Sequence, residues 1–126
     1  MPFDNPLPGP LTDIEILADA RSRIDNPDCW QKGHFRKGHR HCLVAALEVA
    51  CNNPQFDEPS RTERRMTLAM ARQLPRGRGS LQRMICFNPR KRLIRFNDRS
   101  RTTHADVIAL SDRTILHLAN VHAYTD

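Results

Sequence analysis

Aromatic side chains are scarce in this sequence, and long apolar runs are absent. Aromatics make up 6% of the 126 residues, with a single Trp, so we expect a core built on Leu, Ile, Val, Ala and Met. No apolar run approaches the roughly 18–20 residues that a transmembrane helix needs. The N-terminus also lacks the basic start and apolar centre of a signal peptide. The sequence therefore predicts a cytoplasmic protein without membrane contact.

The four cysteines, at positions 29, 42, 51 and 86, show no C-x-x-C spacing. This pattern disfavours a zinc ribbon, and in a reducing cytoplasm we expect free thiols rather than disulfides. Cys29, His34, His39, His41 and Cys42 do crowd one stretch, and such side chains can bind Zn²⁺ or Cu²⁺. Four Lys and Arg side chains in the same stretch oppose a dication, so neither a metal nor a cofactor is predicted.

Acidic side chains are few between residues 61 and 101, where thirteen Lys and Arg stand against two acids. That segment carries +11, whereas the rest of the chain carries −5. A segregated basic face attracts polyanions, so nucleic acid or an acidic protein is the predicted partner. A solvated Arg-rich surface without a partner remains open as the alternative. The candidate anion-binding residues are Arg76, Arg78, Arg90, Lys91, Arg92 and Arg95. Phe87 and Phe96 lie among them and could stack on bases.

The length predicts one domain, and the apolar periods predict a mainly α fold, a compact bundle of about four main helices. We expect these helices over about residues 13–25, 42–52, 61–74 and 104–122. Three capping boxes support three of the four starts: Thr12 to Glu15, Ser60 to Glu63, and Thr103 to Asp106. The second helix is apolar on most sides, which is typical of a central, buried helix.

The remaining segments are less regular. Residues 1–11 hold four of nine prolines and predict an extended arm, which leaves 12–124 as the folded domain. Residues 81–98 favour a short helix followed by a nearly extended segment, with two short strands as the alternative.

The stretch from Cys29 to Cys51 joins a basic, glycine-containing loop to the apolar helix. Trp30 is expected to pack this loop onto the helix, or else to stand with His41 and Phe96 at the mouth of a pocket. The amides in the first turn of a helix stabilise a thiolate, which makes Cys42 a candidate nucleophile.

A cysteine enzyme would need partners for that thiolate. His104 is the candidate base, and Asn97 or Asp98 could orient it, as in thiol hydrolases and acyltransferases. The alternatives remain open. Cys42 could be a small buried residue at a helix crossing. Asn97 and Asp98 could form a turn in which Asp98 pairs with nearby arginines.

Four stretches resemble a bacterial family of unknown function. They are Trp30 to Gly33 (W-x-x-G), Cys42 to Leu47 (C-L-x-G-A-L), Phe96 to Asp98 (W-N-D), and Thr103 to Val107, where Thr introduces the closing helix. Ala45 stands where the family tends to have Gly, and Phe96 where it tends to have Trp. The resemblance spans about residues 12–122 and implies one scaffold but no activity.

The function that the sequence favours is a binding or adaptor module whose basic face, residues 76–101, meets nucleic acid or another anionic partner. The alternative is the cysteine-dependent hydrolase or acyltransferase using Cys42, His104 and Asn97 or Asp98. The oligomeric state is not specified by any pattern in the chain.

Overall fold

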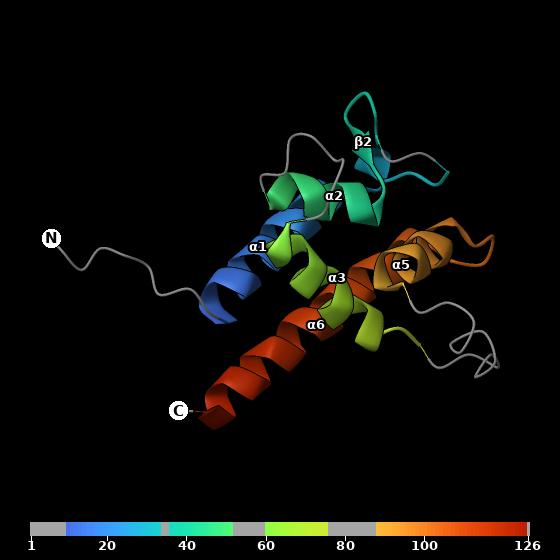
Figure 1. The fold of residues 1–126 in the computed structure, drawn as a ribbon. Helices are drawn as coiled ribbons and strands as arrows, with labels where there is room; N and C mark the ends of the chain where they lie inside the picture. Colours follow the sequence, from blue (N-terminus) through green and yellow to red (C-terminus); the bar gives the residue numbers. More distant parts are fainter. Residues whose placement is uncertain (1–9, 34–35, 52–59, 76–87, 126) are drawn as a thin grey trace, which may run out of the picture.

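The computed structural model describes residues 10–33, 36–51, 60–75 and 88–125, which form a bundle of helices with one short hairpin (Figure 1). The predicted mainly α fold is confirmed. Its elements are α1 (Pro10–Arg23), the 3₁₀ helix η2 (Pro27–Cys29), β1 (Arg36–Lys37), β2 (Arg40–His41), α2 (Leu43–Ala50), α3 (Arg61–Arg72), α5 (Pro89–Asp98) and α6 (His104–Thr125).

Helix α2 lies at the centre of the bundle, where α1, α3 and α5 pack against it. Every residue from Leu43 to Leu47 is at most 1% exposed. Ala45 and Ala46 have small side chains, which allow the neighbouring helices to approach closely. The prediction of a central apolar helix is therefore confirmed, although its bounds are narrower than the expected 42–52.

Two of the three predicted N-terminal caps are present, and the one at Thr103 is a reciprocal capping box. The Ser60 hydroxyl accepts a hydrogen bond from the Glu63 amide at 3.1 Å and caps α3. Thr103 and Asp106 exchange two such bonds, from the Thr103 amide to the Asp106 carboxylate at 2.9 Å and from the Asp106 amide to the Thr103 hydroxyl at 3.2 Å. The box at Thr12 was wrong, because α1 begins at Pro10 and Thr12 lies in its first turn. Proline suits the first helical position, where no amide hydrogen is needed.

Helix α5 replaces the extended segment predicted near residues 88–98. Asn88 caps it by accepting hydrogen bonds from the amides of Arg90 and Lys91, and Pro89 occupies the first turn. Leu93, Phe96 and Asn97 then fall on one buried face. The expectation of strands or extended chain here was wrong, because a capped N-terminus and burial of this one face stabilise the helix. Residues 81–87 lie outside the described residues.

Other predicted segments also lie outside the described part of the chain, namely residues 1–9 of the Pro-rich arm and the loop with Arg76 and Arg78. Pro10 and Leu11, which were expected in the extended arm, belong to α1 instead. Among the described helices, none has the length and hydropathy that a membrane span requires.

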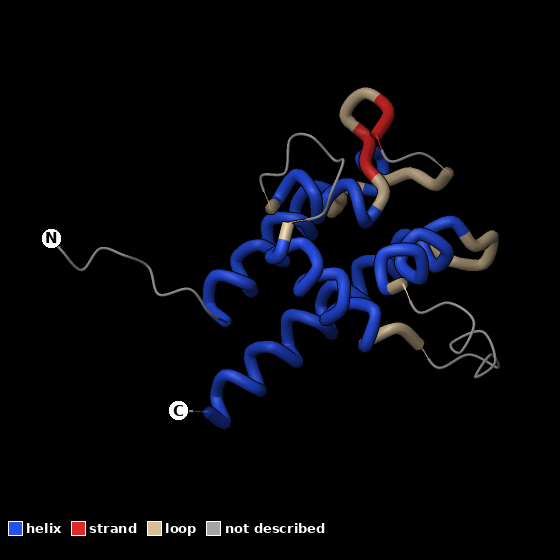
Figure 2. The backbone as a smooth tube through the Cα atoms, viewed as in Figure 1, coloured by secondary structure: helices blue, strands red, loops and turns tan. Residues whose placement is uncertain are grey.

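The hairpin formed by β1 and β2 stands above the N-terminal end of α2, and Figure 2 shows it as the only strand pair of the described residues. Gly38 takes a positive φ of 64° in its turn, a backbone conformation that favours glycine. Trp30 forms an isolated parallel β-bridge with His41 of β2, in which the Gln31 amide donates to the His41 carbonyl at 3.1 Å. The loop after η2 is thereby held alongside β2.

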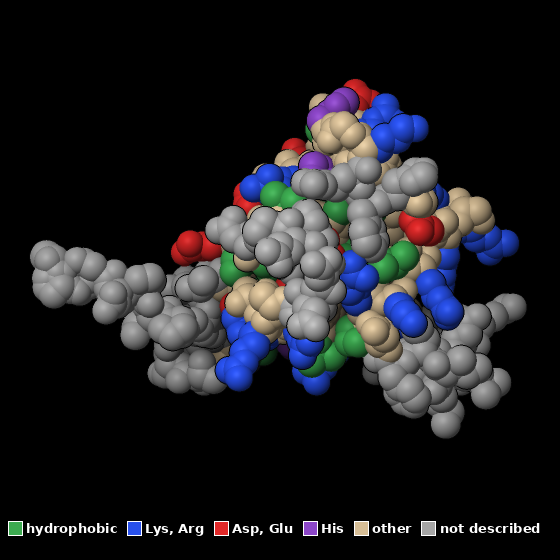
Figure 3. All heavy atoms as spheres, turned by 45° about the horizontal axis from the view of Figure 1, so that its top comes forward, with side chains coloured by type: hydrophobic (Ala, Val, Ile, Leu, Met, Phe, Trp, Pro, Cys, Tyr) green, Lys and Arg blue, Asp and Glu red, His purple; other side chains and the backbone are tan. Residues whose placement is uncertain are grey.

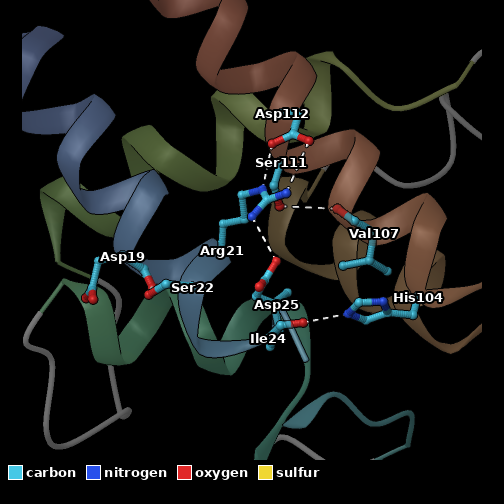
Figure 4. Close-up of polar contacts among 9 residues, drawn as sticks. All are labelled: Asp19, Arg21, Ser22, Ile24, Asp25, His104, Val107, Ser111 and Asp112. Atoms are coloured by element: carbon cyan, nitrogen blue, oxygen red, sulfur yellow. Dashed lines mark hydrogen bonds and ion pairs between the residues drawn. The ribbon is translucent and has the colours of Figure 1, made fainter. Parts of the chain in front are cut away.

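Helices α1 and α6 lie side by side and are joined by polar contacts (Figure 4). Arg21 donates to Asp112 at 2.6 Å and to Asp25 at 2.9 Å. Just after α1, the Ile24 carbonyl oxygen lies 2.6 Å from His104 Nε2. These contacts fix the start of α6 against the end of α1.

Replacing Leu47 by Ala should lower the free energy of unfolding by about 2–5 kcal/mol, because the side chain is fully buried in the central helix. Urea denaturation followed by circular dichroism measures this loss. Leu116→Ala is the matched control, since Leu116 is 61% exposed and should change stability by less than about 0.5 kcal/mol. Equal losses in the two variants would contradict the central place of α2.

Candidate functional site

The side chain of Asn97, at the end of α5, joins three separate parts of the chain. It is fully buried, and its Oδ1 accepts hydrogen bonds from Trp30 Nε1 at 2.7 Å and from the Leu43 amide at 3.2 Å. Its Nδ2 donates to the Gln31 carbonyl at 3.0 Å. One amide group thus holds the loop after η2 and the first residue of α2.

Asp98 extends this network to the glycine of the W-x-x-G stretch. Its Oδ1 accepts from the Gly33 amide at 2.8 Å and from Asn97 Nδ2 at 3.0 Å. Gly33 itself has a φ of 82°, which a side chain would strain. The expected turn at Asn97 and Asp98 was wrong, because both residues end α5.

The expected ion pairs of Asp98 were wrong as well. Arg95, Arg99 and Arg101 all belong to the described part of the chain, and none of them forms a salt bridge with Asp98 there. The carboxylate instead bonds the Gly33 amide, because the fold brings the loop of residues 30–33 against the end of α5.

Trp30 packs against the core rather than standing free. Lys32 Nζ lies over the indole, 5.7 Å from the ring centroid. The centroids of the Trp30 and His104 rings are 5.8 Å apart. Lys32 Nζ also donates to the Arg99 carbonyl. Such contacts agree with the expected role of Trp30 in fastening the loop onto the helices.

The other two residues predicted at a pocket mouth differ in their surroundings. Phe96 is 7% exposed and belongs to the hydrophobic core, where stacking on a ligand is not open to it. His41 is half-buried in β2, with Nδ1 3.2 Å from the His39 carbonyl oxygen. Burial of Phe96 removes the main support for a shared pocket with Trp30.

Cys42 was expected in the first turn of α2. It is instead the N-cap, the residue just before the helix begins. It is 3% exposed, and its Sγ accepts from the Ala45 amide at 3.4 Å. Burial raises the pKa of the thiol to about 11, more than the Ala45 and Val44 amides lower it. At neutral pH the thiolate fraction is then on the order of 10⁻⁴.

The partners proposed for a cysteine nucleophile are held elsewhere. His104 bonds the Ile24 carbonyl, and Asn97 bonds Trp30 and Leu43. Among the described residues, no hydrogen bond joins Cys42 to either of them. The thiol-enzyme hypothesis stays a prediction. The described residues show no hydrogen bond from His104 or Asn97 that would activate the Cys42 thiol.

Four of the six residues predicted to bind anions belong to the described part of the chain, and their surroundings differ. Arg90 Nη2 donates to the buried Glu48 Oε1 at 2.6 Å, so part of its charge is already used inside the bundle. Arg92 is half-buried, with Nη2 3.5 Å from the Ala71 carbonyl. Lys91 and Arg95 are exposed on the outer side of α5.

Sequence reasoning missed a buried charged cluster formed by Glu48, Glu63 and Arg90. Glu48 and Glu63 are each 1% exposed. A signal was available, because Glu48 is the single charged residue in the apolar stretch from Leu43 to Cys51. Such a residue must either leave the buried face or meet an opposite charge.

The three cysteines that the structure describes, Cys29, Cys42 and Cys51, are free thiols, as predicted. Within residues 10–33, 36–51, 60–75 and 88–125, no group of three or more His, Cys, Asp or Glu side chains is placed to hold a metal ion.

The fold and this network define a small, mainly helical domain whose central helix donates its first backbone amide to a buried asparagine. The chain belongs to a family described as a family of unknown function (DUF6197), whose model matches residues 8–117. The resemblance of the sequence to a family of unknown function is thereby confirmed. No curated protein and no solved structure matches the chain.

Asn97→Ala should destabilise the protein by about 2–4 kcal/mol, because it leaves the Trp30 and Leu43 donors without their acceptor. Urea unfolding followed by the fluorescence of Trp30 reports both the stability and the environment of the indole. Asn120→Ala, on the exposed face of α6, is the matched control and should cost almost nothing. An unchanged unfolding midpoint in Asn97→Ala would show that the network is not structural.

Iodoacetamide at neutral pH should leave Cys42 unmodified in the native protein, because the thiol is buried and its pKa is raised. Peptide mass spectrometry identifies the modified cysteines. The same reaction in concentrated urea is the control, and there Cys42 should react fully. Rapid native alkylation of Cys42 would revive the thiol-enzyme hypothesis.

Proposed function

We propose that this protein is a nucleic-acid-binding module that holds a phosphate backbone on the exposed side of α5. The supporting observation is a row of cationic side chains, Lys91, Arg95 and Arg99, spaced four residues apart. Four residues advance a helix by about 6 Å, so these side chains follow one another along one face. We call this row the α5 cationic stripe.

The stripe is available to a partner. Lys91, Arg95 and Arg99 are all exposed, and none has an ion pair with another described residue. Like charges four residues apart repel each other and destabilise a helix by a few tenths of a kcal/mol per pair. A bound polyanion would neutralise these charges, whereas water and dissolved ions only weaken the repulsion between them.

Further positive charge adjoins the stripe. Arg101 is exposed just after α5, and Lys32 reaches the Arg99 carbonyl from the loop beside the hairpin. Lys37 and Arg40 are exposed on the hairpin. Figure 3 shows Lys and Arg side chains both on the hairpin and on the side of α5. This spread suits an extended polyanion better than a small ion.

The chemistry of this face favours phosphate contacts over base recognition. Phe96, which the sequence suggested for base stacking, is buried, and Phe87 lies outside the described residues. Trp30 is half-buried and already contacted by Lys32 and His104. Contacts from Lys and Arg to phosphates position a protein on nucleic acid without reading its sequence. We therefore expect little sequence preference.

The proposal places the protein in the cytoplasm of a bacterial cell, where nucleic acid is abundant. The free thiols of the described cysteines suit such a reducing compartment. An acidic protein is the competing partner, and it would use the same stripe.

Fluorescence anisotropy with labelled duplex DNA and single-stranded RNA tests this function. Binding should weaken by about 10²-fold between 50 and 200 mM salt if about four phosphates are contacted. The triple variant Lys91→Ala, Arg95→Ala, Arg99→Ala should bind more weakly and lose about 0.9 from the salt slope for each phosphate contact removed.

The matched control removes three exposed charges from α3 instead, through Arg61→Ala, Arg64→Ala and Arg72→Ala. This variant has the same net charge as the α5 triple variant and should retain most of the affinity. Equal weakening in both variants would indicate diffuse attraction rather than a site on α5. If neither nucleic acid binds at low salt, the proposed function fails and an acidic protein remains the candidate partner.

A further inference from the structure

Two basic segments that are far apart in the chain meet in the fold. Residues 29–41 hold four Lys and Arg and no acid, and residues 91–101 hold five Lys and Arg and one acid, Asp98. Together the two segments carry a net charge of +8, whereas the rest of the chain carries −2. The first segment contains the hairpin and the second contains most of α5.

The base of the hairpin is fastened to the end of α5. The Asp98 carboxylate accepts from the Gly33 amide at 2.8 Å, and Asn97 Nδ2 donates to the Gln31 carbonyl at 3.0 Å. The Gln31 amide donates in turn to the His41 carbonyl of β2 at 3.1 Å. On the side of the loop and the hairpin, every group in these bonds belongs to the backbone. The hairpin is therefore held in a fixed position relative to α5.

Both elements present positive charge to the solvent. Lys37 and Arg40 are exposed on either side of the turn at Gly38, and the α5 cationic stripe is exposed as well. Figure 1 shows the hairpin standing out from the helices. In Figure 3, Lys and Arg side chains lie on the hairpin and beside α5 on the same face of the molecule.

Asp98 is the one acid of these two segments, and its contacts explain its presence there. It is an exposed residue, so its negative charge weakens the attraction of this face for a polyanion. Its Oδ1, however, accepts from both the Gly33 amide and Asn97 Nδ2. Asp98 thus lowers the positive charge of the face but holds the hairpin in place.

A fixed arrangement of charges suits a ligand whose own charges are fixed. A nucleic-acid duplex holds its phosphates at a regular spacing, about 3.4 Å along the axis for each strand. The major groove of duplex DNA also admits a two-stranded β-ribbon. A single strand is flexible and must lose conformational entropy to fit a rigid surface, which costs affinity.

We propose that the nucleic acid bound by this protein is a duplex, whose backbone is held by the α5 cationic stripe and by Lys37 and Arg40 of the hairpin at the same time. This inference rests on the proposed function and specifies its ligand. The contacts of Asn97 and Asp98 provide the preference for a duplex, because they set the position of the hairpin relative to α5. A single strand meets the same charges without gaining from their fixed arrangement.

Two variants of Asp98 separate geometry from charge. Asp98→Asn and Asp98→Ala each remove one negative charge, but only Asn keeps an oxygen that can accept from the Gly33 amide. Fluorescence anisotropy at one salt concentration compares a labelled DNA duplex with one of its strands. Asp98→Ala should bind the duplex about fivefold more weakly than Asp98→Asn, whereas both variants should bind the single strand equally. Equal duplex affinities of the two variants would overturn the proposal, as would a wild type that binds both ligands equally.

The hairpin contacts are tested by the double variant Lys37→Ala, Arg40→Ala. Its salt slope for the duplex should be smaller by about 1.8, which is 0.9 for each lost phosphate contact. The double variant Arg61→Ala, Arg64→Ala on α3 has the same net charge and should keep a slope close to that of the wild type. The same reduction in both double variants would contradict a duplex contact at the hairpin.

Proton–nitrogen NMR spectra of the wild type give a readout that does not depend on a variant folding. During titration with the duplex, the amide signals of Gly38 in the hairpin and Arg95 in α5 should shift together. Shifts confined to α5 would overturn the inference while the proposed function stands. If the wild type binds neither the duplex nor the single strand at low salt, the proposed function itself fails.

Discussion

The side-chain amide of Asn97 is the interaction on which the arrangement of this domain depends. It accepts from the indole of Trp30 and from the first amide of α2, and it donates to the carbonyl of Gln31. Asparagine is suited to this position because one small group supplies both a donor and an acceptor. Without it, the loop after η2 would bury polar groups that have no partner. The network therefore fixes the loop, α2 and α5 relative to one another.

The same network explains why Cys42 and His104, which the sequence suggested as catalytic residues, have structural contacts in this fold instead. The free amides at the start of α2, which could have stabilised a thiolate, are instead satisfied by Asn97 and by the sulfur of Cys42. His104 is used to join α6 to α1. Reactive residue types gathered near one helix start are thus parts of its capping. Lys91 and Arg95, in contrast, are exposed on the outer side of α5.

Helix α5 divides its charged residues between two environments. Arg90 enters the bundle because two buried carboxylates need a cation, whereas Lys91 and Arg95 remain in water. Leu93 anchors the helix in the core between them. One helix thereby carries the buried charged cluster on its inner side and the cationic stripe on its outer side. Helix spacing alone separates these two roles.

The sequence by itself determined the helical class, the central place of residues 43–50 and the caps at Ser60 and Thr103. These features depend on contacts between residues only a few positions apart, so a pattern along the chain reveals them. Only the tertiary structure decided that residues 89–98 are helical, that Asn97 bonds Trp30, and that Glu48 meets Arg90. Those partners lie 42 to 67 positions apart in the chain. A local pattern shows that such a group needs a partner, but folding decides which one it finds.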